Sequence, residues 1–195
     1  MRHPKAFLSR VPRLFAGLLL PIALALGPAP CAPADQAQDG HANALKVAYL
    51  YNFTRFIQWP EVALGKTFVI AVIGDPALAA ALEVLEGSDK RVQGRPIEVR
   101  VLDRADRLGD SQMLFIGAAA LSDLRRIVAQ TRGRPVLSVG DGRGLAEHGV
   151  AIGLFLKPDI LGTGSRLRFE INRRVIEGSG LKVSAQLYDV AEVVK

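Results

Sequence analysis

The sequence predicts a three-layer, doubly wound α/β domain, whose mostly parallel sheet carries a terminal antiparallel hairpin strand. Short apolar runs rich in β-branched residues alternate with segments of helical periodicity, which is typical of βαβ units and a parallel sheet. The first run, 67–73 (TFVIAVI), is continuously apolar, as expected for a strand that is buried on both faces. Only the turn 158–164 separates the last two runs, so they should pair as an antiparallel hairpin.

The expected elements begin at residue 42. The segment 42–59 places apolar side chains at spacings of three and four, which predicts an amphipathic helix that Pro60 ends. After the first strand, Asp75 suits a helix N-cap and Pro76 a first helical position, so a helix is expected over 76–85. Further strands are expected at 97–102, 113–116, 135–139, 150–156 and 167–171, and further helices at 119–131, 172–179 and 185–194.

Residues 1–34 are predicted to be a secretory signal peptide and not part of the domain. Residues 1–13 carry four basic residues and no acid, an apolar run follows over 14–26, and Ala32-Pro33-Ala34 is a small-x-small cleavage site. This order of basic, apolar and small residues is typical of an exported protein. The polar residues 35–40 should then form a flexible tail, and 41–195 a single domain.

We expect the exported protein to be soluble in the periplasm and to begin near Asp35. N-terminal sequencing of the protein recovered from the periplasmic fraction measures this directly. Cys31 follows the apolar run and provides the alternative, a lipoprotein, although Pro30 stands where a small residue is usual. A mature chain that begins at a lipidated Cys31 would contradict the expected cleavage.

Removal of the leader changes what the composition implies. The whole chain has 25 basic and 19 acidic residues and a net charge of +6; the leader holds four of the basic residues and none of the acidic ones, which leaves +2 for the mature chain. Nucleic-acid binding needs concentrated positive charge, so no nucleic-acid partner is expected. The single cysteine also lies in the leader, so the mature chain should have no disulfide, thiolate metal site or cysteine nucleophile.

No group of residues in the sequence predicts an enzyme, a metal centre or a bound cofactor. The histidines, His3, His41 and His148, are not clustered with other metal-ligating residues. A serine-based triad would have to use His148, and no G-x-S-x-G motif accompanies it. No G-x-G-x-x-G or P-loop pattern follows the first strand, so no nucleotide site is expected.

Glycine-rich loops after the expected strands are one candidate for a ligand site. In a parallel sheet such loops gather at one edge, where ligands usually bind. Asp75, Gly140, Asp141 and Arg143 lie in these loops, and glycine lets a ligand approach the backbone closely. The alternative is that these residues only form tight strand-to-helix turns.

The expected first helix concentrates aromatic side chains within 49–59. Tyr49, Phe53 and Phe56 share one helical face and are expected in the core, whereas Tyr51 and Trp59 fall off that face. Aromatic residues away from the core are typical of binding hot spots, so the helix is a candidate partner surface.

This partner surface should also contain Asn52 and Arg55 from the first helix, and Leu187 and Tyr188 from the last. If Trp59 is exposed, Trp59→Ala should weaken partner binding about thirtyfold and leave the fold intact. The alternative is that Trp59 packs the helix end against the turn that follows.

The chain resembles the YfiR family over residues 41–195. The segment 44–60 (ALKVAYLYNFTRFIQWP) is similar to the aromatic opening helix of that family. The segments 167–172 (LRFEIN) and 179–184 (SGLKVS) resemble its final strand and the turn before its last helix.

The resemblance implies a periplasmic protein without enzymatic activity, which holds a membrane-bound diguanylate cyclase inactive by binding its periplasmic sensor domain. Release of the cyclase raises cyclic di-GMP and favours biofilm. Disulfide-linked redox sensing is known in the family, but it does not carry over to a mature chain without cysteine.

The expected function is therefore a periplasmic regulatory binding protein that represses a membrane signalling protein. The alternative is a periplasmic small-solute-binding protein that uses the glycine-rich loops. Whether the protein forms a homodimer stays open.

Overall fold

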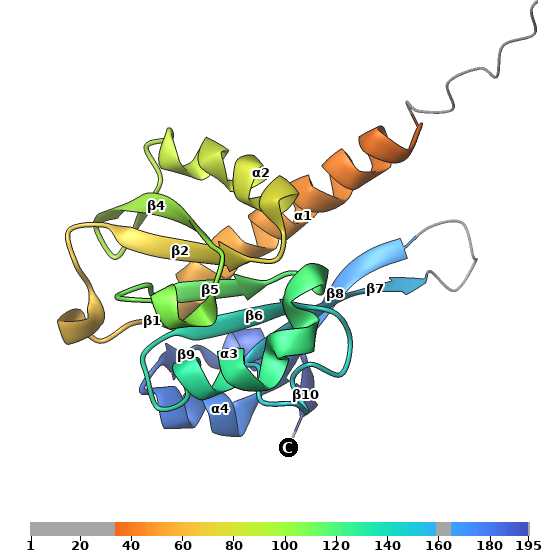
Figure 1. The fold of residues 1–195 in the computed structure, drawn as a ribbon. Coiled ribbons are helices and arrows are strands. Elements are labelled where there is room, and N and C mark those ends of the chain that lie inside the picture. Colours follow the sequence, from red (N-terminus) through yellow and green to blue (C-terminus); the bar gives the residue numbers. More distant parts are fainter. Residues whose placement is uncertain (1–33, 159–164, 195) are drawn as a thin grey trace, which may run out of the picture. The chain divides into compact units, whose positions relative to one another are not determined.

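A computed structural model describes residues 34–158 and 165–194 of the chain (Figure 1). At its centre is an eight-stranded sheet with the strand order β10-β8-β7-β6-β5-β2-β4-β3. The strands are β2 (Phe68–Ile73), β3 (Arg91–Val92), β4 (Arg95–Leu102), β5 (Met113–Ile116), β6 (Leu137–Asp141), β7 (Ile152–Pro158), β8 (Ser165–Asn172) and β10 (Glu192–Val194). Strands β2, β4, β5, β6 and β7 run parallel, and β7 and β8 form the expected antiparallel hairpin. The predicted fold class is confirmed.

The sheet is wound in both directions from β2. Strand β4 lies on one side of β2, and β5, β6, β7 and β8 follow on the other side. The link from β2 to β4 is helix α2 (Pro76–Glu86), which begins as its sequence predicts: Asp75 caps it by accepting a hydrogen bond from the Leu78 amide at 2.8 Å. The strand order therefore reverses between β2 and β5, which is the topological switch point of the sheet.

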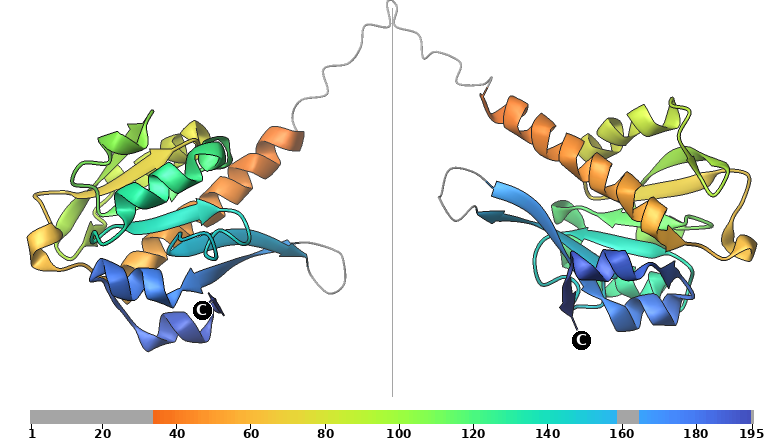
Figure 2. Two further views of the ribbon diagram at one scale, coloured as in Figure 1. Left: turned by 60° about the horizontal axis from the view of Figure 1, so that its bottom comes forward. Right: turned by 180° about the vertical axis from the view of Figure 1, so that it is seen from behind.

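Helices cover both faces of this sheet (Figure 2). The remaining helices are α1 (Ala34–Phe56), α3 (Leu124–Thr131), α4 (Arg173–Ser179) and α5 (Ala185–Asp189), with 3-10 turns η1 (Glu61–Ala63), η2 (Ala105–Arg107) and η3 (Ala118–Asp123). Strand β2 shows the layering, because Ile70 and Val72 pack in one core cluster with α1 and α2, whereas Ala71 and Ile73 pack in the other with α3. The result is the expected three-layer arrangement.

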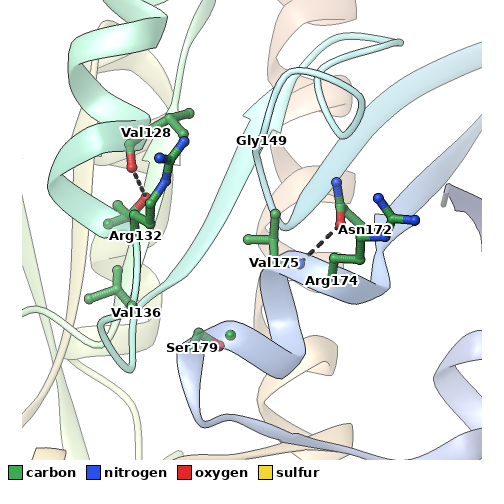
Figure 3. Close-up of a pocket in the computed structure, with 11 residues that line it drawn as sticks. Val128, Arg132, Val136, Gly149, Asn172, Arg174, Val175 and Ser179 are labelled. Atoms are coloured by element: carbon green, nitrogen blue, oxygen red, sulfur yellow. Dashed lines mark hydrogen bonds between the residues drawn. The ribbon is translucent and has the colours of Figure 1, made fainter.

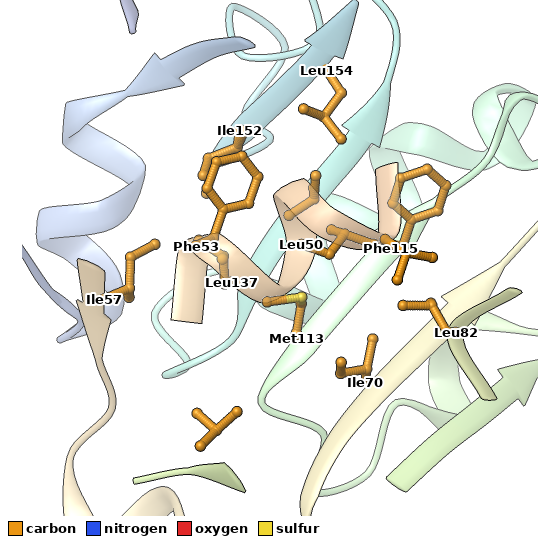
Figure 4. Close-up of a cluster of buried hydrophobic side chains, with 14 of the residues drawn as sticks. Leu50, Phe53, Ile57, Ile70, Leu82, Met113, Phe115, Leu137, Ile152 and Leu154 are labelled. Carbon is orange, nitrogen blue, oxygen red and sulfur yellow. The ribbon is translucent and has the colours of Figure 1, made fainter. Parts of the chain in front are cut away.

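The larger core lies where α1 and α2 meet the sheet (Figure 4). Leu50 and Phe53 from α1 pack there with Leu82 from α2 and with Ile70 and Phe115 from the strands. All five side chains are almost completely excluded from solvent. Because buried apolar area is the main favourable term in folding, α1 is an integral part of the domain.

Helix α1 differs from its expected limits at both ends. It begins at Ala34, so the segment 35–40, expected as a flexible tail, is helical. The tail was expected because these residues lack apolar periodicity. A helix is held by its own backbone hydrogen bonds, so a segment without an apolar face can still be helical. At the other end, α1 stops at Phe56, because strand β1 (Ile57–Gln58) pairs antiparallel with β9 (Lys182–Val183).

The C-terminal segment also differs from expectation. Only Ala185–Asp189 of the predicted helix 185–194 is helical, and Glu192–Val194 forms the edge strand β10 parallel to β8. Its valines suit a strand, and the Glu192 carboxylate is held by Arg143 and Lys157 at 2.9 and 3.2 Å. Pairing with β8 thus overrides the helical periodicity.

Two predicted features fall outside the described residues. These are the signal peptide, apart from Ala34, and the turn between β7 and β8 over 159–164. Across the ranges 34–158 and 165–194, none of the helices has the length and apolar character that a bilayer span requires.

Candidate functional site

A groove runs between α1, β8 and α5. It consists of two adjoining cavities of about 320 Å³ each, which share Tyr49 and Arg168. We call it the α1–β8 groove. The residues that line it are Leu45, Tyr49, Asn52, Phe53 and Phe56 from α1, Ser165 to Phe169 from β8, Leu187 from α5, and Val190.

Aromatic side chains fix α1 against β8 and form the wall of this groove. Phe53 meets Phe169 edge to face with ring centres 5.1 Å apart, and Tyr49 contacts both rings at 6.2 and 6.3 Å. The Tyr49 hydroxyl donates a hydrogen bond to the Leu167 carbonyl oxygen at 2.8 Å. The aromatic face predicted for the first helix is thus in the core, and its outer edge lines the groove.

The rim of the α1–β8 groove combines an apolar side chain with polar ones. Val190 follows α5 and is 60% exposed. Asn52 and Arg168 are also exposed, and Arg168 forms no ion pair with any described residue. An apolar anchor point with polar neighbours is the usual anatomy of a protein interface.

The structure brings together only some of the predicted partner-binding residues. Asn52 and Leu187 line the α1–β8 groove, and Arg55 is exposed on α1. Tyr188 does not line the groove; it is half-buried, with the Arg173 guanidinium of α4 4.7 Å from its ring centre. Tyr51 lies elsewhere, because its ring faces Lys90 after α2 at 5.6 Å.

Burial affects the chemistry of Tyr188. It raises the pKa of the Tyr188 hydroxyl above the usual value for tyrosine, and the nearby charge of Arg173 offsets part of that rise. The phenol is therefore a neutral hydrogen-bonding group at physiological pH.

Two of the predicted partner-binding residues are buried, and the prediction of their exposure was wrong. Trp59 is 3% exposed; its indole nitrogen donates to the Gln112 carbonyl oxygen at 2.9 Å, and its ring packs edge-on against Phe68 at 4.8 Å. The cause is the early end of α1: along β1, burial alternates as in a strand, and this turns Trp59 into the core. Leu187 is also 3% exposed, so it can offer a partner only the edge that lines the groove.

The strand-end residues predicted as a ligand site are each engaged within the chain. Asp75 caps α2. Asp141 forms an ion pair with Lys46 of α1 at 2.6 Å. Arg143 forms an ion pair with Glu192, and its guanidinium lies over the Phe155 ring, 4.7 Å from the ring centre. A side chain at Gly140 would meet Leu145 at 2.5 Å.

The switch point itself is also closed by close backbone packing. A Cβ atom at Gly117 after β5 would lie 2.4 Å from the Gly74 carbonyl oxygen after β2. Glycine at this position allows the close contact between the two loops. This fits the alternative in which these residues form tight turns and not a ligand site.

Several residues of the α1–β8 groove could not be selected from the sequence. The alternation of Leu167, Arg168 and Phe169 does mark one exposed residue between two buried ones, but nothing in it shows that α1 lies alongside. Val190 was expected inside a helix. Among the described residues, no three His, Cys, Asp or Glu side chains gather as metal ligands would.

Comparison with known proteins gives one family match. Residues 43–192 match the DUF4154 family, described as YfiR/HmsC-like. The matched range contains every residue that lines the α1–β8 groove. Comparison with curated protein sequences gave no significant match.

Proposed function

Because the chain belongs to the YfiR/HmsC-like family, we propose that it is a periplasmic regulatory protein that represses a membrane-bound diguanylate cyclase. It acts by binding the periplasmic sensor domain of that enzyme. Family membership favours regulation over catalysis, and the function therefore depends on stoichiometric binding.

The α1–β8 groove is the observation that carries this proposal. It is the place where the aromatic first helix and the final long strand meet the last helix, and the first two are segments whose sequences resemble the family. Its exposed Val190 supplies apolar surface, and burial of a valine side chain contributes about 1.5–3 kcal/mol. Polar contacts from Asn52 and Arg168 at the rim determine how the partner is oriented and which partner is bound.

Repression then follows from a preference between two states of the partner. A protein that binds only the inactive conformation of a sensor domain shifts the equilibrium towards it, by an amount set by the difference in affinity. Nothing in this scheme requires a cysteine. Relief of repression needs only a competitor for the groove or a ligand that weakens binding.

The small-solute alternative at the glycine-rich loops has less support. Each of Asp75, Gly140, Asp141 and Arg143 already serves a cap, a close contact or an ion pair. The proposed function therefore places the working surface at the α1–β8 groove.

The test is the cellular level of cyclic di-GMP in a strain from which the gene is deleted. We expect the level to rise, and expression of the full chain to restore it. A matched chain that begins at Asp35 behind an initiating methionine, and so stays in the cytoplasm, should fail to restore it. An unchanged cyclic di-GMP level after deletion, or full restoration by the cytoplasmic chain, would contradict the proposal.

A further inference from the structure

A second cavity, of about 300 Å³, lies between α3 and α4, away from the α1–β8 groove (Figure 3). It sits where β6 and β7 begin and β8 ends. We call it the α3–α4 cavity. No part of the proposed function uses it.

The interior of the α3–α4 cavity is apolar. Val128, Val136 and Val175 line it, and the buried polar side chains beside them are already satisfied. The Asn172 amide donates to the Ala146 carbonyl oxygen at 2.7 Å and accepts from the Val175 amide at 3.0 Å.

The two buried hydroxyls of the lining are satisfied in the same way. The hydroxyl of Thr131 bonds to the carbonyl oxygen of Val128 at 3.1 Å, and that of Ser179 to the carbonyl oxygen of Ile176 at 2.7 Å. The cavity interior therefore offers an occupant dispersion contacts and exclusion of water. It has no aromatic ring in its lining, so it suits an aliphatic group better than a planar one.

Two arginines flank this apolar interior from opposite walls. Arg132 follows α3, Arg174 lies in the first turn of α4, and both are exposed. Neither forms an ion pair with another residue in the described ranges. No acidic side chain lines the cavity. Guanidinium groups bind carboxylates through paired hydrogen bonds, so the mouth of the cavity favours a carboxylate.

We propose that the α3–α4 cavity binds a small aliphatic carboxylate, with its chain among the valines and its carboxylate at the arginine-bearing rim. Its lining shares no residue with the α1–β8 groove. Such a site would give the protein a means to sense a metabolite without disulfide chemistry.

Gly178 provides a way to block the cavity without disturbing the core. It lies on α4 and lines the cavity, and a Cβ atom there meets nothing within 4 Å. Leucine has a higher helix propensity than glycine, so Gly178→Leu should fill the space and leave the helix intact.

The experiment titrates hexanoate into the purified mature protein and follows binding by calorimetry and NMR. We expect saturable binding of hexanoate, and at least about tenfold weaker binding of hexanamide, which lacks the charge, and of inorganic phosphate, which lacks the aliphatic chain. Gly178→Leu and the double variant Arg132→Gln/Arg174→Gln should each weaken hexanoate binding at least about tenfold. Arg125→Gln, at an exposed position of α3 outside the cavity, should bind hexanoate as the wild type does.

Unfolding midpoints of all variants are measured alongside, so that loss of binding is compared only among folded proteins. Equal affinity for hexanoate and hexanamide, or unchanged affinity in the arginine double variant, would overturn the proposal. Absence of saturable hexanoate binding to the wild type would overturn it as well. None of these results bears on the cyclic di-GMP measurement, so the two proposals fail separately.

Discussion

Replacing Phe53 by alanine is expected to lower the free energy of unfolding by about 3–5 kcal/mol. Phe53 is 2% exposed and holds α1 against β8 through its contact with Phe169. The truncation removes this contact and leaves a cavity in the larger core. Denaturant unfolding followed by circular dichroism measures the change.

Phe56→Ala is the matched control for this prediction. It is the same substitution on the same helix, at a half-buried position, so it should cost clearly less than Phe53→Ala. An unfolding midpoint of Phe53→Ala equal to that of the wild type would mean that α1 does not pack against β8 as described.

Trp59→Ala is expected to have an effect of similar size, a loss of about 3–5 kcal/mol. The substitution empties the space beside Phe68 and leaves the Gln112 carbonyl oxygen without its indole donor. Trp59→Phe keeps an aromatic ring and removes the N–H group. The Gln112 carbonyl oxygen still accepts a hydrogen bond from the Leu137 amide at 2.9 Å, so losing the indole hydrogen bond should cost about 0.5–1.5 kcal/mol. Unfolding midpoints of the two variants separate the packing contribution from the hydrogen bond.

This expectation replaces the earlier hypothesis that Trp59 is an exposed partner contact. The same Trp59→Ala protein, measured for both stability and partner affinity, distinguishes the two readings. Wild-type stability combined with about thirtyfold weaker partner binding would restore Trp59 to the partner surface and contradict its buried position.

Much of the fold follows from local patterns in the sequence. The run TFVIAVI forms β2 with all of its described strand residues buried, because a central parallel strand needs apolar side chains on both faces. Helix α2 begins at the predicted cap, since Asp75 and Pro76 determine that turn by themselves. The β7–β8 hairpin follows from the short connection between its strands.

The errors occur where distant segments decide the local structure. β1 exists only because β9, more than a hundred residues away along the chain, pairs with it, and this pairing buries Trp59. Likewise, β10 forms because β8 offers it an edge. Sequence periodicity within 42–59 or 185–194 contains no information about these partners, so both were predicted as helix.

The candidate sites divide in the same way. Asn52 and Leu187 were predicted from aromatic and apolar clustering and do line the α1–β8 groove. Arg168 and Val190 were not, because their importance depends on the approach of α1 to β8. The α3–α4 cavity draws its lining from three separate segments of the chain, and no motif in the sequence marks it.

The central claim is that the protein works by binding its partner through the α1–β8 groove, and one comparison tests it most directly. Val190→Glu places a charge at the exposed apolar position of the groove, and Val84→Glu makes the same change on α2, at a valine that is 67% exposed. The unfolding midpoints of both variants are first shown to equal that of the wild type. Calorimetry then measures the affinity of each variant for the periplasmic sensor domain of the repressed cyclase. The account predicts at least about tenfold weaker binding for Val190→Glu and wild-type affinity for Val84→Glu. Wild-type affinity in Val190→Glu, or equal losses in the two variants, would contradict it.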